Sequence, residues 1–297
     1  MEYSNKFDKN IALYATETSN FIDSGWPRKI NMMDEAWVIN NQMFHSSKNS
    51  GVEIPIKVVP HASDFSKFEK GYKKVDFSAP KDNFIFYTIA DFNKRKNIEA
   101  FITAFHSEFD PSEPVSILIK THKYGMSPDE TALKIRDMCN SIKINLKKFS
   151  KIEDYKEDLI VTSFVSDKDI CNIHNSCNCF VMPSYGEAWC IPAFDAMGFG
   201  KTPICTNIGG MSDFIGHAGF LIEGAMEPVF GMVDTFPNLF TGNEDWCSVS
   251  INGLKECMRH VYENQDSLKN MKSEGLKKAY EYSHKNIGNL IKELLNA

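Results

Sequence analysis

Residues 183–200 read PSYGEAWCIPAFDAMGFG, and this stretch decides the fold. It follows a short apolar run over residues 179–182, which is typical of a buried strand, and it leads through a loop into a helical pattern. Pro192 suits the first position of that helix, whose N-terminus presents free backbone N–H groups and a positive dipole end. The stretch therefore predicts a strand, a loop and a helix with room for a phosphate group between them.

Two carboxylates accompany the start of this helix. Glu187 lies in the loop and Asp195 is placed in the first helical turn, so both are expected to face one pocket beyond the sheet. Carboxylates accept hydrogen bonds from vicinal hydroxyls, which suits a sugar or a ribose. On the alternative reading, Asp195 balances the helix dipole and Glu187 is a solvated loop acid. The residues alone leave both readings open.

Outward from this stretch, short apolar runs alternate with helical patterns from about residue 80 onward. Strands are predicted over residues 84–90, 115–121, 159–164, 179–182 and 202–206, and helices over 98–109, 128–146, 167–176 and 192–199. Asn97, Ser127 and Ser166 are expected to cap three of the helices, Ser127 in a capping box with Glu130. This order predicts an α/β fold with a Rossmann-type, doubly wound parallel sheet that binds ligands at the carboxyl ends of its strands.

The first 78 residues follow a different pattern. They contain one predicted helix over residues 26–33, apolar runs over 36–39 and 56–59, and a polar, lysine-rich linker over 63–80. Residues 253–297 are predicted to be helical with few breaks. We expect a partial N-terminal domain with a crossover linker, residues 1–78, and a Rossmann-like domain with C-terminal helices, residues 79–297.

Composition excludes several classes of protein. The 297 residues carry a net charge of −6, which does not favour nucleic-acid binding, and the hydrophobic share of 42% is ordinary for a globular protein. No apolar run approaches the roughly 20 residues of a membrane span, and no signal-peptide pattern is present, so a cytoplasmic location is predicted. The spacing of Cys171, His174 and Cys177 fits core packing better than zinc binding, and no metal site is predicted.

The stretch 183–200 resembles the signature of glycosyltransferase family four, which reads Pro-Ser, two residues, Glu-Gly-Phe-Gly-Leu-Pro, and then Glu-Ala-Met-Ala. In that family seven residues separate two glutamates, as they separate Glu187 and Asp195 here, with Asp in place of the second Glu. Residues 95–97, Arg-Lys-Asn, resemble the motif that opens the family's nucleotide-binding domain. The similarity extends in order over residues 17–290, including residues 34–38, 51–61 and 200–213.

The resemblance implies a GT-B fold and a retaining, hexosyltransferase-like enzyme. Such an enzyme moves a sugar from a nucleoside diphosphate sugar, UDP- or GDP-linked, to a hydroxyl of a glycan or small-molecule acceptor. Residues 79–297 are then the nucleotide-sugar domain, and residues 1–78 belong to the acceptor side. Neither a metal nor another cofactor is implied as a requirement.

The same resemblance assigns roles to residues. Glu187 is expected to contact hydroxyls of the donor sugar, and Asp195 those of the ribose. Lys96, helped by Arg95, neutralises the diphosphate and stabilises the leaving group. The backbone of three consecutive residues lines the diphosphate: Trp189, Cys190 and Ile191.

Further donor-site residues are predicted at two other strand ends. Lys120 ends a buried strand, where a cation is unusual, so it is either a second phosphate ligand or a strand-end surface lysine. The base is expected near Phe164, Val165 and Ser166.

The sequence departs from the family in two respects. Ala188 and Cys190 replace both glycines of the Gly-Phe-Gly element, so the approach of the backbone to the phosphate is expected to differ. The early strands of the first domain, its glycine-rich acceptor loop and its histidine are absent, which indicates a reduced or truncated domain, a missing N-terminal segment or a partner chain. The alternatives are therefore a nucleotide-sugar-binding module, or a truncated, catalytically incomplete subunit. An epimerase on the same fold needs an acid/base pair that the sequence does not place.

Overall fold

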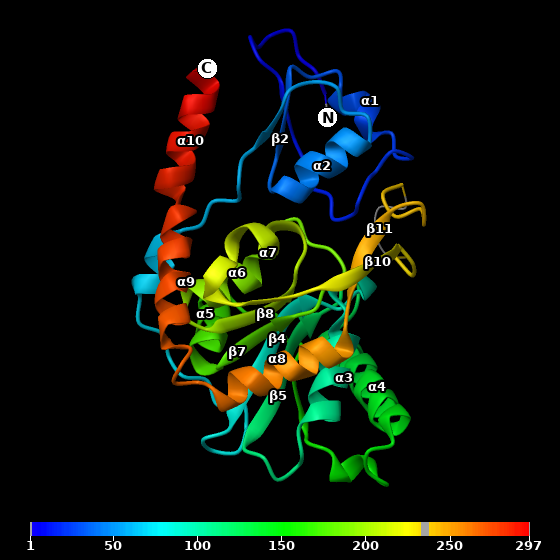
Figure 1. Ribbon diagram of the computed structural model, residues 1–297, viewed down its shortest axis with the longest axis vertical. Helices are drawn as coiled ribbons and strands as arrows, with labels where there is room; N and C mark the ends of the chain where they lie inside the picture. Colours follow the sequence, from blue (N-terminus) through cyan, green and yellow to red (C-terminus); the bar gives the residue numbers. More distant parts are fainter. Residues whose placement is uncertain (1, 233–237, 297) are drawn as a thin grey trace.

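The computed structural model describes residues 2–232 and 238–296 (Figure 1). Its strands are β1 (Ile11–Leu13), β2 (Glu35–Val38), β3 (Ile56–Val58), β4 (Phe84–Asp91), β5 (Val115–His122), β6 (Asp158–Val161), β7 (Cys179–Met182), β8 (Thr202–Thr206), β9 (Phe220–Ile222), β10 (Gly224–Pro228) and β11 (Asp245–Val249). Its α-helices are α1 (Trp26–Ile30), α2 (Asn41–Asn49), α3 (Ile98–Glu108), α4 (Pro128–Leu146), α5 (Asp167–Ser176), α6 (Ile191–Gly198), α7 (Gly209–Phe214), α8 (Ile251–Glu263), α9 (Lys269–Glu281) and α10 (His284–Asn296). Short 3-10 turns are η1 (Phe65–Glu69), η2 (Lys94–Lys96), η3 (Ile152–Asp154) and η4 (Gly216–Ala218).

The larger part of the chain is built on a six-stranded sheet with the order β6-β5-β4-β7-β8-β9. Every neighbouring pair in this sheet is parallel. From β4 the chain winds outward through β5 to β6, then returns through α5 to β7 and winds the other way. Because such crossovers are right-handed, α3 and α4 cover one face and α5 and α6 the other, as Figure 1 shows. The predicted α/β, doubly wound parallel sheet is confirmed.

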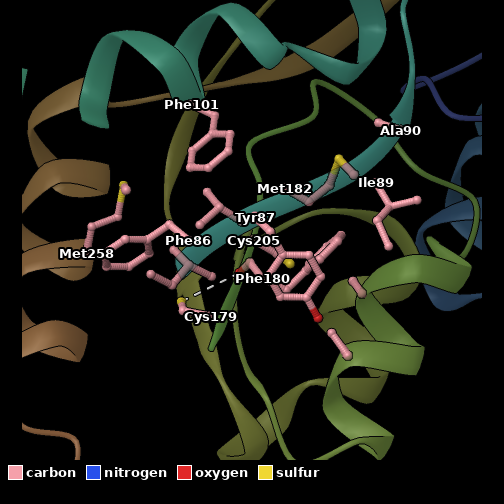
Figure 2. Packing of buried hydrophobic residues seen from close by; sticks show 14 of the residues in the cluster. Phe86, Tyr87, Ile89, Ala90, Phe101, Cys179, Phe180, Met182, Cys205 and Met258 are labelled. Carbon is pink, nitrogen blue, oxygen red and sulfur yellow. Dashed lines mark hydrogen bonds between the residues drawn. The ribbon is translucent and has the colours of Figure 1, made fainter. Parts of the chain in front are cut away.

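The core of this part lies on both faces of β4 and β7 (Figure 2). Phe86 and Tyr87 of β4 are fully buried, and alternation along the strand sends their side chains to opposite faces. Phe101 and Met258 reach the same cluster from α3 and α8. Burial on two faces explains why these strands are continuous apolar runs in the sequence.

A second, smaller sheet occupies the N-terminal part, with the parallel order β1-β2-β3. Its own cluster includes Phe21, Ile30, Val38 and Met43. The last helix, α10, runs beside this part in Figure 1 and packs Ile287 against Trp37 and Val59. The C-terminal end of the chain therefore helps to hold the N-terminal part in place.

Most predicted elements are present, and some differ in extent. The capping boxes at Ser127 and Ser166 both form. Asn97 stands at the helix start but its side chain does not cap it, because the amide donates to the carbonyl of Pro183 instead, at 3.1 Å. The predicted strand over residues 159–164 ends at Val161, and Phe164 is 78% exposed. The helix predicted over residues 26–33 ends at Ile30.

Among the α-helices and strands, those not predicted are β1, α2, α7, β9 and the antiparallel pair β10–β11. Helix α2 has the sequence NQMFHSSKN, which contains few apolar residues, so it shows no clear helical pattern of apolar positions. No helix within residues 2–232 and 238–296 is both long and apolar enough to cross a bilayer.

Candidate active site

The candidate site lies where the winding of the large sheet reverses, between β4 and β7. These two strands are neighbours, and the chain leaves them toward helices on opposite faces of the sheet. In open parallel sheets this reversal creates a crevice at the carboxyl ends of the strands, where ligands bind. The turn η2 follows β4 and the loop 183–190 follows β7, so the two predicted motifs meet here. A backbone hydrogen bond from Tyr185 N to Arg95 O, 2.8 Å long, joins them.

A compact cluster of charges occupies this crevice. Lys96 Nζ lies 2.6 Å from Glu187 Oε1, and Arg95 Nη1 lies 3.2 Å from Glu187 Oε2. Burial alone would raise the pKa of the Glu187 carboxyl, but Lys96 and Arg95 together hold it below its ordinary value. The ionised form of Glu187 is therefore favoured by a cation on each oxygen. The structure brings together the three residues predicted to act on the donor.

Arg95 is also linked to the N-terminal part of the chain. Its Nη1 donates to the carbonyl of Gly186 at 2.6 Å, and its Nη2 lies 3.5 Å from Glu17 Oε1. A side chain at Gly186 would overlap the carbonyl oxygen of Glu17, so glycine is needed for this close approach. The segment after β1 thus rests directly on the loop that carries Glu187.

The same loop is held from a second direction by the start of α2. Asn40 donates from its side-chain amide to the carbonyl of Ala188, and Gln42 accepts from Gly209 N at 2.6 Å. Gly209 has a φ of +59°, and a side chain there would overlap the carbonyl oxygen of Glu187. Side chains from the N-terminal part and from the larger part of the chain therefore both hold the backbone around Glu187.

The backbone at the start of α6 is strained. Cys190 occupies the position of the motif's second glycine, and it adopts a left-handed conformation with φ +67° and ψ +69°. Non-glycine residues adopt this conformation rarely, and such strain is concentrated at functional sites.

Asp195 opens on a different part of the crevice. It lies beyond the first turn of α6, not within it as predicted, and it lines a cavity of about 670 Å³ together with Ile191, Tyr72 and Lys67. Glu187 is not among the lining residues of this cavity. Lys67 Nζ, from η1 in the crossover, lies 2.5 Å from Asp195 Oδ1. Burial raises the pKa of Asp195 above its ordinary value, and Lys67 offsets only part of that effect.

The other predicted site residues are distributed as follows. Trp189 is buried, and its ring packs against Phe194, Phe214 and Tyr282, so only its backbone can face a phosphate.

Lys120 is buried near the end of β5, where its Nζ lies 3.5 Å from the carbonyl of Thr121. Burial lowers the pKa of Lys120, and Asp91 opposes the shift. Val165 lines a separate cavity beside the edge strand β6, and Ser166 caps α5. These three residues are not in contact with the Glu187 cluster within the described parts of the chain.

Three residues that contact the predicted site were missed: Lys67, Glu17 and Asn40. Each lies far along the chain from its partner, and each is a single polar residue in a segment without a motif. Their only sequence signal is position, since Lys67 lies in the crossover and Glu17 and Asn40 follow short apolar runs. Such signals do not specify a partner.

Comparison with known proteins agrees with this geometry. Residues 141–228 match the family model for glycosyl transferases group 1, and this range runs from β6 to β10 and includes the loop with Glu187 and the helix with Asp195. This stretch of the chain is therefore similar to group 1 glycosyltransferases. The predicted resemblance to group 1 glycosyltransferases is thereby confirmed.

Among curated proteins, the serotype-specific mannosyltransferase WbdA of Escherichia coli is 30% identical over 138 residues. The match covers 46% of this chain but only 15% of WbdA. The chain thus corresponds to a small part of that relative's length.

Solved structures show that the chain shares the GT-B fold of known glycosyltransferases. A glycosyltransferase from Rickettsia africae superposes with a TM-score of 0.68 at 13% identity, covering 96% of this chain and 69% of that one. Anabaena HepE in complex with UDP-glucose gives 0.67 at 14% identity, covering 96% and 71%. Sucrose-phosphate synthase from Thermosynechococcus elongatus gives 0.67 at 15% identity, covering 91% and 60%. At such identities the likeness establishes the fold alone.

Proposed function

We propose that this chain binds a nucleoside diphosphate sugar at the crevice between β4 and β7 and transfers its sugar, with retention, to an acceptor hydroxyl. The observation that carries the proposal is the cluster of the buried Glu187 with the partly buried Arg95 and Lys96 at the reversal point of the sheet. Two cations and an ionised carboxylate at the carboxyl ends of parallel strands suit a ligand with both phosphate and hydroxyl groups. Residues 79–297 form the donor side in this proposal, and residues 1–78 the acceptor side.

The diphosphate lies beside Arg95, Lys96 and the N-terminus of α6. A unit-charge pair about 4 Å apart is worth roughly 4 kcal/mol at an effective dielectric of about 20, compared with about 1 kcal/mol for a neutral hydrogen bond. The two cations therefore dominate phosphate recognition, and free N–H groups near Cys190 and Ile191 add directional contacts. Glu187 then accepts from hydroxyls of the sugar.

Asp195 holds the ribose in the cavity that opens beside α6. Ile191 is exposed and lines this cavity, and it also begins the helix whose N-terminus faces the phosphates. The two carboxylates thus act on different parts of one extended ligand. The nucleoside in this proposal is uridine or guanosine. Because HepE has been solved with UDP-glucose and WbdA is a mannosyltransferase, we propose that the sugar of the donor is a hexose.

Transfer breaks the bond between the sugar's anomeric carbon and the diphosphate oxygen, and forms a bond from that carbon to the acceptor oxygen on the same face. The departing phosphate oxygen accepts the acceptor's proton. Negative charge grows on that oxygen as the bond breaks, and Lys96 and Arg95 stabilise it. No side-chain nucleophile is required. We also propose that these cations carry the diphosphate charge without a metal, so that transfer persists in excess EDTA.

The test is a product assay with the purified chain, UDP- and GDP-linked hexoses and a panel of glycan acceptors. Glu187→Ala is expected to abolish transfer while circular dichroism shows an intact fold. Glu153→Ala is the matched control, because Glu153 lies in η3, away from the crevice. Full activity of Glu187→Ala would remove Glu187 from the site and with it the proposed function.

A further inference from the structure

Both cations proposed to bind the donor phosphates are already paired with carboxylates. Glu187 contacts Lys96 and Arg95, and Glu17 contacts the other amino group of Arg95. Two cations and two carboxylates give this cluster a formal charge of zero. The pKa of Arg95 is raised by Glu187 and Glu17 in spite of its burial, so its charge is already balanced by protein groups.

A nucleoside diphosphate sugar brings two further negative charges to this place. A neutral cluster offers them no net attraction, and carboxylate oxygens within a few ångströms repel them. Tight binding of a diphosphate therefore requires that one of the two carboxylates gives up its cation.

The geometry distinguishes which carboxylate leaves. The side chain of Glu187 is 5% exposed and has two cation partners at 2.6 and 3.2 Å. The side chain of Glu17 is 23% exposed and has one, at 3.5 Å. Separating Glu187 from its partners would strand a buried charge, whereas the Glu17 carboxylate can turn toward water. Glu17 is the group that yields.

We propose that Glu17 is an intramolecular competitor that occupies Arg95 until the donor diphosphate replaces it. This inference rests on the proposed function, because it needs the diphosphate at Arg95. Glu17 belongs to the N-terminal part, and its backbone lies against Gly186 in the loop that carries Glu187. Donor binding thus breaks a contact between the two parts of the chain and sets the affinity of the site through a residue of the smaller part.

The experiment measures the dissociation constants of UDP and GDP by calorimetry at low ionic strength for the full chain and its variants. Glu17→Gln removes the charge but keeps the size of the side chain. It is expected to tighten nucleotide binding by roughly three- to tenfold, and added salt should narrow the difference.

The matched control is Glu99→Gln, which also removes one negative charge next to η2. Glu99 pairs with Lys94 at 3.9 Å and has no ion pair with Arg95 or Lys96 among the described residues. Its dissociation constants should stay within twofold of the wild type. Tightening of equal size in both variants would reduce the effect to net charge and overturn the proposal.

Arg95→Gln separates this inference from the proposed function, with Lys96→Gln as a second variant because Arg95 is buried. Both should weaken binding. If they do and Glu17→Gln weakens binding or leaves it unchanged, Glu17 is not a competitor, and only this inference fails. If neither weakens binding, the diphosphate lies elsewhere, and the proposed placement fails as well.

Discussion

The surroundings of Glu187 and Asp195 differ although both carboxylates come from one motif and both are buried. Glu187 has a cation on each oxygen, and its pKa is held below the ordinary value against the effect of burial. Asp195 has one lysine, and burial raises its pKa. The surroundings of Glu187 therefore favour its ionised form, whereas those of Asp195 favour its protonated form.

This difference teaches that the spacing of two carboxylates in a motif does not determine which protonation state each of them favours. The cations of Glu187 are neighbours within the same large domain, whereas the lysine of Asp195 comes from the crossover. The ion pairs of Glu187 are thus positioned by loops that follow strands of the large sheet, whereas the ion pair of Asp195 depends on the position of the crossover segment.

The largest expected effect comes from the backbone that supports Glu187. Gly209→Ala combines a φ of +59° with overlap on the carbonyl oxygen of Glu187, so it should lower the free energy of unfolding by roughly 4 kcal/mol. Urea denaturation measures this. Gly25→Ala is the control, because nothing lies within 4 Å of the added carbon and its φ is −75°. Equal, small effects for both would show that the loop is not closely supported.

Replacing each carboxylate by its amide should change stability in opposite directions. Glu187→Gln removes the carboxylate that pairs with both Lys96 and Arg95 and should lower the free energy of unfolding by roughly 3 kcal/mol at neutral pH. Asp195→Asn removes a charge that burial disfavours and should raise it, on the order of 1 kcal/mol. Urea denaturation at neutral pH measures both. A decrease of similar size in the free energy of unfolding of both variants would contradict the proposed difference between Glu187 and Asp195.

The pH dependence follows from the same contrast. Because the folded-state pKa of Glu187 is lowered, its stabilisation is present above its unfolded pKa and disappears only as pH falls through the folded value. The pKa of Asp195 is raised, so its folded form takes up a proton first on acidification, and donor binding should weaken there. The KM for the donor, measured over a series of decreasing pH values, should therefore rise on acidification before the stabilisation from Glu187 is lost.

Lys67 is predicted to set where that rise begins. Lys67→Met removes the only cation paired with Asp195 among the described residues, so the acid limb of the KM profile should move to higher pH. Lys67→Arg should restore the profile toward that of the wild type. An unchanged profile in Lys67→Met would mean that Asp195 does not titrate in donor binding.

The smallest effect is expected at Cys190, which lies between the two carboxylates. Glycine adopts this left-handed conformation without strain, so Cys190→Gly should change the free energy of unfolding by less than about 1 kcal/mol and keep activity. Cys190→Val should cost about 2 kcal/mol, because a β-branched side chain is disfavoured there. Thermal unfolding and the product assay compare the two variants. Equal losses of stability in Cys190→Gly and Cys190→Val would show that the backbone conformation at this position is not the cause of the destabilisation.

The sequence predicted the parts of this molecule that local rules govern. The apolar runs identified β4, β7 and β8, the caps at Ser127 and Ser166 located two helices, and order alone predicted the reversal of the sheet. The family resemblance implied that Lys96 and Glu187 belong to one site, and the structure brings the two side chains together.

What the sequence could not predict depends on contacts between distant segments. The pairing of Lys67 with Asp195, and of Glu17 with Arg95, follows from how the crossover and the small sheet pack on the large one. The same packing separates Val165 from the cavity of Asp195. Such contacts carry no local periodicity, so their residues cannot be recognised one by one.

The most direct test is a crystal structure of the chain with the nucleoside diphosphate that binds it more tightly, UDP or GDP. We predict that the diphosphate lies between Lys96, Arg95 and the N-terminus of α6, with the ribose hydroxyls on Asp195. A nucleotide bound away from both carboxylates, for example in the cavity beside β6, would contradict the assignment of this crevice as the donor site.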